Sequence, residues 1–515
     1  MNLNKLLTAL RQRKNTPARA QQAGRHERYT HALEQFLDGH QPAVRLGGVY
    51  TLANLADEWL TDTSLPEQVR REEAQTIIDA LTECIRTPYP LAQKRQVLEA
   101  DEAPEGYEGD FARDQEALRE EQLVRRSVFM EFSRHLAAIA ESNKAGNEES
   151  QRTVPPISPM WADLRFDFSG APIFYPLRQL HFQNADFASA TFYGPADFFG
   201  ATFHGDTSFS AAQFTADASF HGVTFTGEVD FSDAVFSAAA DFAVSAFKSD
   251  ADFSRLNTAG IASFAALTFE GKAVFTASTF HDEAHFAASV FNRPAVFSKS
   301  LFGGTARFAG IATKQSAMFS NVRFTGAADF SGASFTQYED FGGARFDGDA
   351  TFSRSSFFEV LRTSYDMDFP QYANFAKAAF AQEADFSKAT FTASVGFGKV
   401  TFAGAVSFNG ANFAGAYFAD AKFSQKADFR QTRFAYAEPS FWDSEGQQKS
   451  ARFSAQADPQ DYLFGTRSES PYGFSCGEAQ LLNRTFVLPL GTVLYDPDSW
   501  DEEKQDYTRF SEPAQ

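Results

Sequence analysis

Residues 185–214 read ADFASATFYGPADFFGATFHGDTSFSAAQF, and the phenylalanines in this stretch recur at steps that alternate between five and six residues. The position two before each Phe is nearly always small, most often Ala. In an extended segment, residues i and i−2 share a face, so each Phe and its small neighbour point the same way. Four such steps span 22 residues, which predicts a four-sided coil with Phe187, Phe209 and Phe231 stacked in successive coils. Because a coil can bury its Phe only against its neighbours, the pattern predicts a solenoid.

The pattern continues to Phe434 and explains why the 515-residue chain contains 59 Phe. Units such as ADFSGASF at 328–335 and ADFSKATF at 384–391 make the stretch 182–434 resemble the pentapeptide-repeat proteins. That resemblance implies an all-β solenoid, a right-handed four-sided β-helix with about 22 residues per coil. The chain departs from the commonest pattern by using Phe where Leu is frequent and by adding a sixth residue in alternate faces.

Three interruptions of the pattern conserve side-chain volume. Where the expected Phe is replaced by Thr, the residue two positions earlier becomes large, as in the pairs Leu256 and Thr258, Ile311 and Thr313, and Leu361 and Thr363. Such an exchange is what close packing of the interior requires. An extra residue in FFEVLRTSYDMDF, at 357–369, predicts a bulge or a protruding loop.

The residues before the repeats predict a helical head over 1–142. Apolar residues at helical spacing indicate helices at about 22–37, 43–60, 66–86 and 110–141. The segment RHERYTHALEQF, followed by AVRLGGVYTLANLADEW, resembles the head that precedes the repeats in many bacterial pentapeptide-repeat proteins. Gly47 and Gly48 each cost about 1 kcal/mol relative to Ala inside a helix, which predicts another backbone close by. The last helix has an apolar stripe that is expected to pack on the head or over the end of the repeats, or else to bind a partner. The stripe consists of Leu118, Leu123, Val128, Phe129, Phe132, Leu136 and Ile139.

The remaining segments complete the domain organisation. Polar, proline-rich residues 143–159 predict a linker, 160–440 the solenoid, and 441–515 a C-terminal cap followed by an acidic tail on the surface. Both ends of a solenoid need covers, because exposed strand edges pair with other chains.

Charge and cysteine content restrict the function classes. The net charge of −20 disfavours nucleic acid and anionic membranes as direct ligands. The two cysteines, Cys84 and Cys476, form no framework of bridges, which favours a reducing compartment. No segment has eighteen consecutive apolar residues, so we expect a soluble, cytoplasmic protein without a membrane span.

The sequence offers little catalytic chemistry. His281 and His285 in FHDEAHF have the spacing of a metal pair on a helix, but Phe280 and Phe286 place them on solenoid faces, where we expect solvated histidines. No Ser-His-Asp grouping, phosphate-binding glycine loop or Cys/His set is recognisable. We therefore predict no enzyme, no catalytic, cofactor-binding or metal-binding residues, and no cofactor.

Aspartates that precede Phe form two outward rows. Asp186, Asp230, Asp252 and Asp340 fall on one face, and Asp197, Asp241 and Asp329 on the opposite face. Some pentapeptide-repeat proteins resemble a DNA duplex and bind type II topoisomerases, so the resemblance implies, as one alternative, a DNA-mimicking topoisomerase regulator. The other reading is that Asp keeps a Phe-rich solenoid in solution, and the 20 bases among 27 acids over 160–434 favour it. The primary prediction is a noncatalytic interaction or scaffold protein whose unknown protein partner binds through the head.

The volume exchange can be tested directly. Leu256→Ala should destabilise the fold as a core truncation does, by about 2–5 kcal/mol, and Thr258→Phe alone should overpack the coil. The double variant should recover much of the loss in denaturant unfolding. No recovery would mean that the two positions do not share one space.

Overall fold

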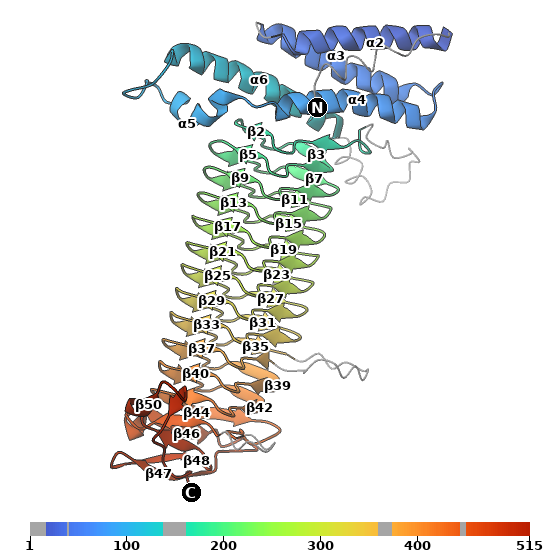
Figure 1. The fold of residues 1–515 in the computed structure, drawn as a ribbon. Helices are drawn as coiled ribbons and strands as arrows, with labels where there is room; N and C mark the ends of the chain where they lie inside the picture. Colours follow the sequence, from blue (N-terminus) through green and yellow to red (C-terminus); the bar gives the residue numbers. More distant parts are fainter. Residues whose placement is uncertain (1–16, 39–40, 137–160, 359–372, 443–449) are drawn as a thin grey trace. The chain divides into compact units, whose positions relative to one another are not determined.

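The computed structural model describes residues 17–38, 41–136, 161–358, 373–442 and 450–515, and Figure 1 shows its fold. It is a parallel β-solenoid of about 12 coils of roughly 22 residues, with an N-terminal helical region. The predicted linker at 143–159 and the pair Leu361 and Thr363 lie outside the described residues. The chain divides into one compact unit that runs to Ser219 and includes Val223–Gly227, and a second that holds the remainder.

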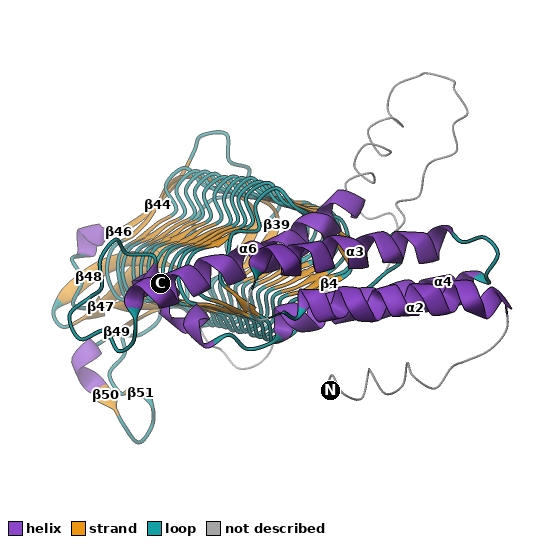
Figure 2. Ribbon diagram, turned by 90° about the horizontal axis from the view of Figure 1, so that it is seen from above, coloured by secondary structure: helices purple, strands orange, loops and turns teal. Residues whose placement is uncertain are grey.

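The first unit begins with the predicted helices. They are α2 (Pro17–Phe36), α3 (Pro42–Thr61), α4 (Glu67–Arg86), the 3-10 turn η1 (Pro90–Lys94), α5 (Arg95–Leu98) and α6 (Phe111–Leu136). Helices α2 and α3 lie side by side in Figure 2. A Cβ added at Gly48 would lie 2.5 Å from the backbone nitrogen of Phe36, whereas nothing lies within 4 Å at Gly47. The predicted close backbone is therefore confirmed at Gly48 alone.

Helix α6 packs over the first coil of the solenoid. The Phe129 ring lies 4.7 Å from the Phe168 ring and parallel to the Phe187 ring at 6.4 Å. Phe132 contacts Phe166 of strand β1 (Phe166–Asp167) at 5.0 Å. The interpretation that this helix covers the end of the repeats is thus confirmed.

The second unit shows the coil in its regular form. One coil contains β16 (Ala251–Asp252), β17 (Asn257–Thr258), β18 (Ala262–Ser263) and β19 (Thr268–Phe269). Each strand pairs in parallel with the strand 22 residues later, as Ala251 does with Ala273. Inside, the Phe253 and Phe275 rings stack 4.8 Å apart with 2° between their planes. The predicted repeat and the inward direction of Phe are confirmed.

The outward aspartates hold the corners between faces. Asp252 Oδ1 accepts a hydrogen bond of 2.8 Å from the Ser254 backbone N–H, and Arg255 then adopts a left-handed φ of 56°. The Leu256 N–H closes this turn by donating to the Phe253 carbonyl at 3.1 Å. The same contact to the residue two positions on recurs at Asp167, Asp186, Asp197, Asp230, Asp241, Asp329, Asp340, Asp385 and Asp428. These aspartates therefore order the turns as well as facing solvent.

The interruptions are packed as predicted. Leu256 and Thr258 are both buried, and so are Ile311 and Thr313. Neither Thr hydroxyl has a hydrogen-bond partner among the described residues. Each Thr thus occupies a position built for an apolar side chain.

The end of the chain closes the second unit. The Phe stack continues past residue 440, with Phe453 of β45 (Arg452–Ser454) 4.7 Å from Phe423. The hairpin of β47 (Cys476–Leu481) and β48 (Arg484–Pro489) buries Phe486. The final residue, Gln515, exchanges backbone hydrogen bonds with Glu478. The C-terminal residues are therefore built into the cap.

One acid lies inside the solenoid. Glu339 in β32 (Glu339–Asp340) is 1% exposed, at a position where the preceding coil has Ala317. Its carboxyl accepts a hydrogen bond of 3.1 Å from the Gln337 N–H. Burial outweighs that bond and raises the pKa of Glu339 to about 9. The interior thus favours a neutral carboxylic acid.

Glu339 should make stability depend on pH. Between about pH 5 and pH 9 the folded chain keeps the proton that the unfolded chain has released, so the free energy of unfolding should fall as pH rises, by up to about 1.4 kcal/mol per pH unit. Glu339→Gln should remove this slope. Denaturant unfolding across that range would measure it, and parallel pH profiles for the two proteins would contradict the assignment.

Candidate functional site

The two histidines with metal-pair spacing have different surroundings. His281 is exposed, whereas His285 is half-buried and lies 2.9 Å from Glu283 and 3.1 Å from Arg307. Among the residues that the structure describes, no group of three or more His, Cys, Asp or Glu is placed to hold a metal ion. His285 thus takes part in a surface group with Glu283 and Arg307, whereas His281 only faces solvent.

The acidic rows are interrupted. In the register of the paired strands, Asp252 is followed by Val274, Val296 and Met318 before Asp340 continues the row. On the opposite face, Asp241 is followed by Ser263, His285 and Arg307 before Asp329. Bases also pair with surface acids, as Arg255 does with Asp233 at 2.6 Å. The described surface therefore lacks a continuous negative row along these two faces.

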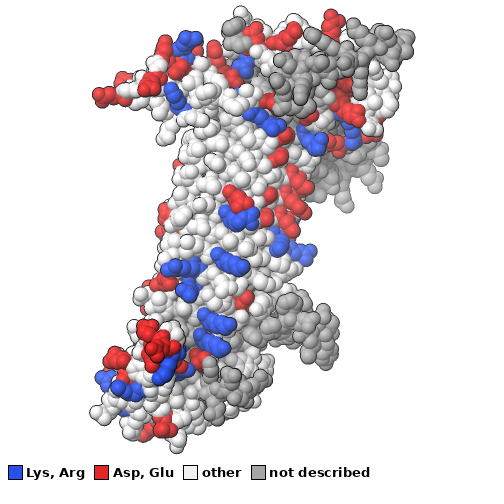
Figure 3. Space-filling model, viewed as in Figure 1, with Lys and Arg blue, Asp and Glu red and all other residues white. Residues whose placement is uncertain are grey.

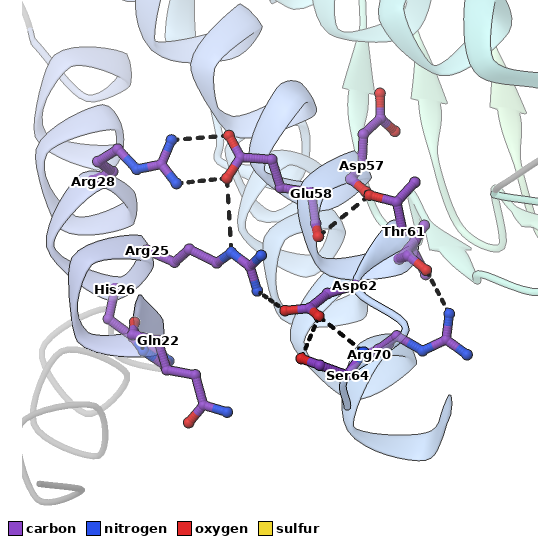
Figure 4. Close-up of polar contacts among 11 residues, drawn as sticks. Gln22, Arg25, His26, Arg28, Asp57, Glu58, Thr61, Asp62, Ser64 and Arg70 are labelled. Atoms are coloured by element: carbon purple, nitrogen blue, oxygen red, sulfur yellow. Dashed lines mark hydrogen bonds and ion pairs between the residues drawn. The ribbon is translucent and has the colours of Figure 1, made fainter. Parts of the chain in front are cut away.

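Polar side chains at one end of the head join α2 to α3, as Figure 4 shows. Arg28 donates to both carboxylate oxygens of Glu58, at 2.9 and 2.5 Å. Arg25 donates to Asp62 at 2.7 Å. The Ser64 hydroxyl and then Arg25 lower the pKa of Asp62 to about 2. These charges hold the helices together, which is a structural role.

The head is fastened to the first coils by hydrogen bonds to backbone carbonyls. Arg95 Nη1 donates to the Tyr193 carbonyl at 2.8 Å, and Gln122 Nε2 donates to the Phe174 carbonyl at 2.8 Å. Arg86 donates to the Ser169 carbonyl at 3.0 Å. Such side chains recognise the coil by its backbone, so the contact depends on the shape of the coil more than on its side chains.

A histidine and an aspartate of the head also contact a tryptophan that precedes the first coil. The His135 ring of α6 stacks on the buried Trp161 ring at 3.9 Å with 6° between the planes. Asp57 of α3 accepts from Trp161 Nε1 at 2.8 Å and faces His135 Nε2 at 3.0 Å. His135 Nδ1 lies 2.7 Å from the Glu131 carbonyl oxygen. Since both ring nitrogens face groups that only accept, the geometry favours the charged imidazolium.

The surroundings of His135 have two opposite effects on its pKa. Burial disfavours the charged ring, but the hydrogen bonds to the Asp57 carboxylate and the Glu131 carbonyl outweigh it and raise the pKa of His135. Arg134 opposes that rise. Neither the pairing nor the stacking was evident in the sequence, because the three side chains come from distant positions.

The outward surface of the head differs from the sequence interpretation. Tyr29 and Val49 are buried, as ordinary packing of the head requires, whereas Tyr50 is 47% exposed. On α6, Leu123 and Met130 lie two turns apart and are 53% and 51% exposed. Leu123 had been expected to face inward. The helix therefore has an inner apolar face on the coil and two large apolar side chains on its outside.

A comparison with family models matches the description "Pentapeptide repeats (9 copies)" to residues 178–224 and 314–360. These two segments of the chain therefore carry pentapeptide repeats. No curated protein and no solved structure matches it. The matched residues belong to the regular coils, so the family assignment rests on the solenoid and says nothing of the head.

No helix in the described part of this chain has the length and apolar character needed to cross a membrane. Helices α2, α3, α4 and α6 each contain charged residues, as α6 does in its run Arg119, Glu120 and Glu121.

The contribution of His135 to the stability of the fold should decrease at alkaline pH. Because the folded pKa lies above the ordinary value of about 6.5, its stabilisation should be complete below that pH and disappear as pH rises through the folded pKa. A charged hydrogen bond of this kind contributes about 1–3 kcal/mol. His135→Gln should make the fall of stability with pH shallower, leaving the part due to Glu339, while His31→Gln, at an exposed position, should leave the profile unchanged. A slope as steep after His135→Gln as before it would assign the effect to another group.

Proposed function

We propose that this chain is a noncatalytic scaffold whose helical head binds a protein partner. The observation that carries the proposal is the double character of α6. A helix that only covered the end of the solenoid would need one apolar face, yet α6 also exposes Leu123 and Met130 on its outside. Large exposed apolar side chains of this kind mark many protein-binding surfaces.

The firm attachment of the head supports this function. Arg95, Gln122 and the group around Asp57 tie it to the first coils. A partner bound to α6 would thus be held at a fixed place on the coils, which is what a scaffold requires. The two cysteines, one buried and one exposed, are both free, which supports our inference of a cytoplasmic location.

The alternative, a DNA-mimicking regulator of a type II topoisomerase, needs negative charge that continues along the solenoid. A duplex carries about one negative charge per 1.7 Å of axis. The rows here are interrupted by Val274, Val296, Met318 and Arg307. These interruptions favour the scaffold over the mimic.

The proposal is tested by affinity capture with the full chain and two variants. Leu123→Ser with Met130→Ser removes the outer apolar side chains of α6, and Val244→Ser with Ile261→Ser removes two equally exposed ones from the solenoid. We expect recovery of the captured partner to fall at least tenfold for the head variant alone. Equal recovery from both variants would contradict binding through the head.

The alternative needs its own measurement. In a supercoiling assay with a type II topoisomerase, we expect no effect of the full chain. If the chain inhibits the topoisomerase, and the variant with Leu123→Ser and Met130→Ser still does, the DNA-mimic proposal would replace the scaffold proposal.

A further inference from the structure

Basic side chains follow one corner of the second unit, one in each of six consecutive coils. We call this set the basic stripe, and it consists of Lys299, Arg323, Arg345, Lys377, Lys399 and Lys422. Lys299, Lys377 and Lys399 occupy the left-handed corner position, with φ of 65°, 63° and 59°. Arg323, Arg345 and Lys422 lie two residues after that position, on the adjoining face.

Backbone hydrogen bonds establish that these corners stack. Lys299 N donates to the Ser320 carbonyl at 2.9 Å, and Asn321 N to the Gly342 carbonyl at 2.9 Å. The series continues from Gly343 to Ala376, from Lys377 to Gly398 and from Lys399 to Ala419. On the face, Arg323 and Arg345 are direct partners in neighbouring strands β29 (Arg323–Phe324) and β33 (Arg345–Phe346). The stripe is therefore continuous from coil to coil.

Most of the stripe is unneutralised. Arg323 pairs with Asp347 at 2.7 Å, and the Lys422 ammonium lies over the rings of Trp500 and Tyr507. Within the described residues, the side chains of Lys299, Arg345, Lys377 and Lys399 are exposed and make no ion pair or hydrogen bond. Four cationic groups are thus available on one edge of a protein whose net charge is −20.

The flanks of the stripe are small and nearly neutral. The residues just before the corner positions are Ser298, Ser320, Gly342, Ala376 and Gly398. The nearest acid on the preceding face, Asp340, already accepts from Gly342 N and Asn374 Nδ2, both at 2.8 Å. The sixth corner position is itself an acid, Asp420, and it pairs with Arg452 at 3.3 Å. Figure 3 shows Lys and Arg atoms gathered on this part of the solenoid, with few acidic atoms beside them. Small flanking side chains leave room for another backbone to approach.

We infer that the basic stripe binds an extended acidic segment of a partner protein. At a strand spacing of about 4.8 Å, six coils span about 24 Å, the length of roughly seven residues of extended chain. This surface lies outside the head and goes beyond the proposed function. The binding proposed for the head and the binding inferred for the stripe can therefore be disproved independently.

A nucleic acid fits the stripe less well. Over the five coils from Lys299 to Lys399, no described residue at these corners or in the strands beside them is an exposed aromatic on which a base could stack, and the exposed Tyr417 and Trp500 lie only at the Lys422 end. Residues 435–515, which follow directly, contain 14 acidic and 6 basic residues, and they would repel a long polyanion. A short acidic peptide can bind along the stripe without reaching residues 435–515.

The test uses the full chain and a fluorescein-labelled octaglutamate peptide, with binding measured by anisotropy at several salt concentrations. The stripe variant carries Lys299→Glu, Lys377→Glu and Lys399→Glu. The matched control carries Lys314→Glu, Arg354→Glu and Lys388→Glu, which makes the same change in net charge at exposed positions. Arg354 and Lys388 also occupy left-handed corners, with φ of 58°, so the control matches the backbone conformation at two of the three positions.

We expect the stripe variant to bind the peptide at least tenfold more weakly than the unchanged chain, with the control within threefold, and salt to weaken binding to the unchanged chain. Equal losses in both variants, or no binding to the unchanged chain, would overturn the inference. Tighter binding of a single-stranded oligonucleotide or of anionic vesicles than of the peptide would also overturn it. If the Glu variant unfolds, as seen by circular dichroism, the three Lys→Gln changes provide the same comparison with less repulsion.

Discussion

The solenoid depends on the agreement of two repeats, the spacing of hydrogen-bonded strands and the spacing between the centres of stacked aromatic rings. Phe275 and Phe297 lie 4.9 Å apart with 1° between their planes, while parallel strands lie about 4.8 Å apart. The backbone ladder and the ring stack can therefore continue together from coil to coil without strain in either. Each inward position must conform to that common repeat, which is why Thr258 is accepted only beside Leu256 and why Glu339 is favoured as a neutral acid.

This agreement also explains how much of the fold was predictable. The Phe period and the exchange between Leu256 and Thr258 are local patterns, so the sequence alone indicated the coil and its packing. The corner role of Asp252 was missed because it requires the left-handed conformation of Arg255, which sequence spacing does not reveal. From the sequence alone, an aspartate that faces solvent was therefore interpreted as serving only solubility.

The possible binding surfaces were harder to predict, for two physical reasons. Asp57, His135 and Trp161 meet across 78 and 104 sequence positions, and no periodicity connects a helix to a coil. The basic stripe is periodic, but the step from Gly343 to Lys377 is 34 residues where a regular coil has 22, so a fixed period loses the row there. The outward Leu123 was misassigned because an amphipathic pattern assumes one apolar face, and α6 has apolar side chains on two.

The stacking of Lys299, Asn321 and Gly343 at equivalent corners has a consequence for the evolution of the gene. A duplication or deletion of 22 codons within the regular coils would add or remove one whole layer, leaving every remaining Phe inside and every outward row aligned. Coils of other lengths also occur, with 34 residues from Gly343 to Lys377 and 21 from Phe402 to Phe423, so a change of another length keeps the rows aligned only where the difference falls between strands. Selection can therefore lengthen or shorten a row of outward side chains by whole coils, without changing the packing of the interior.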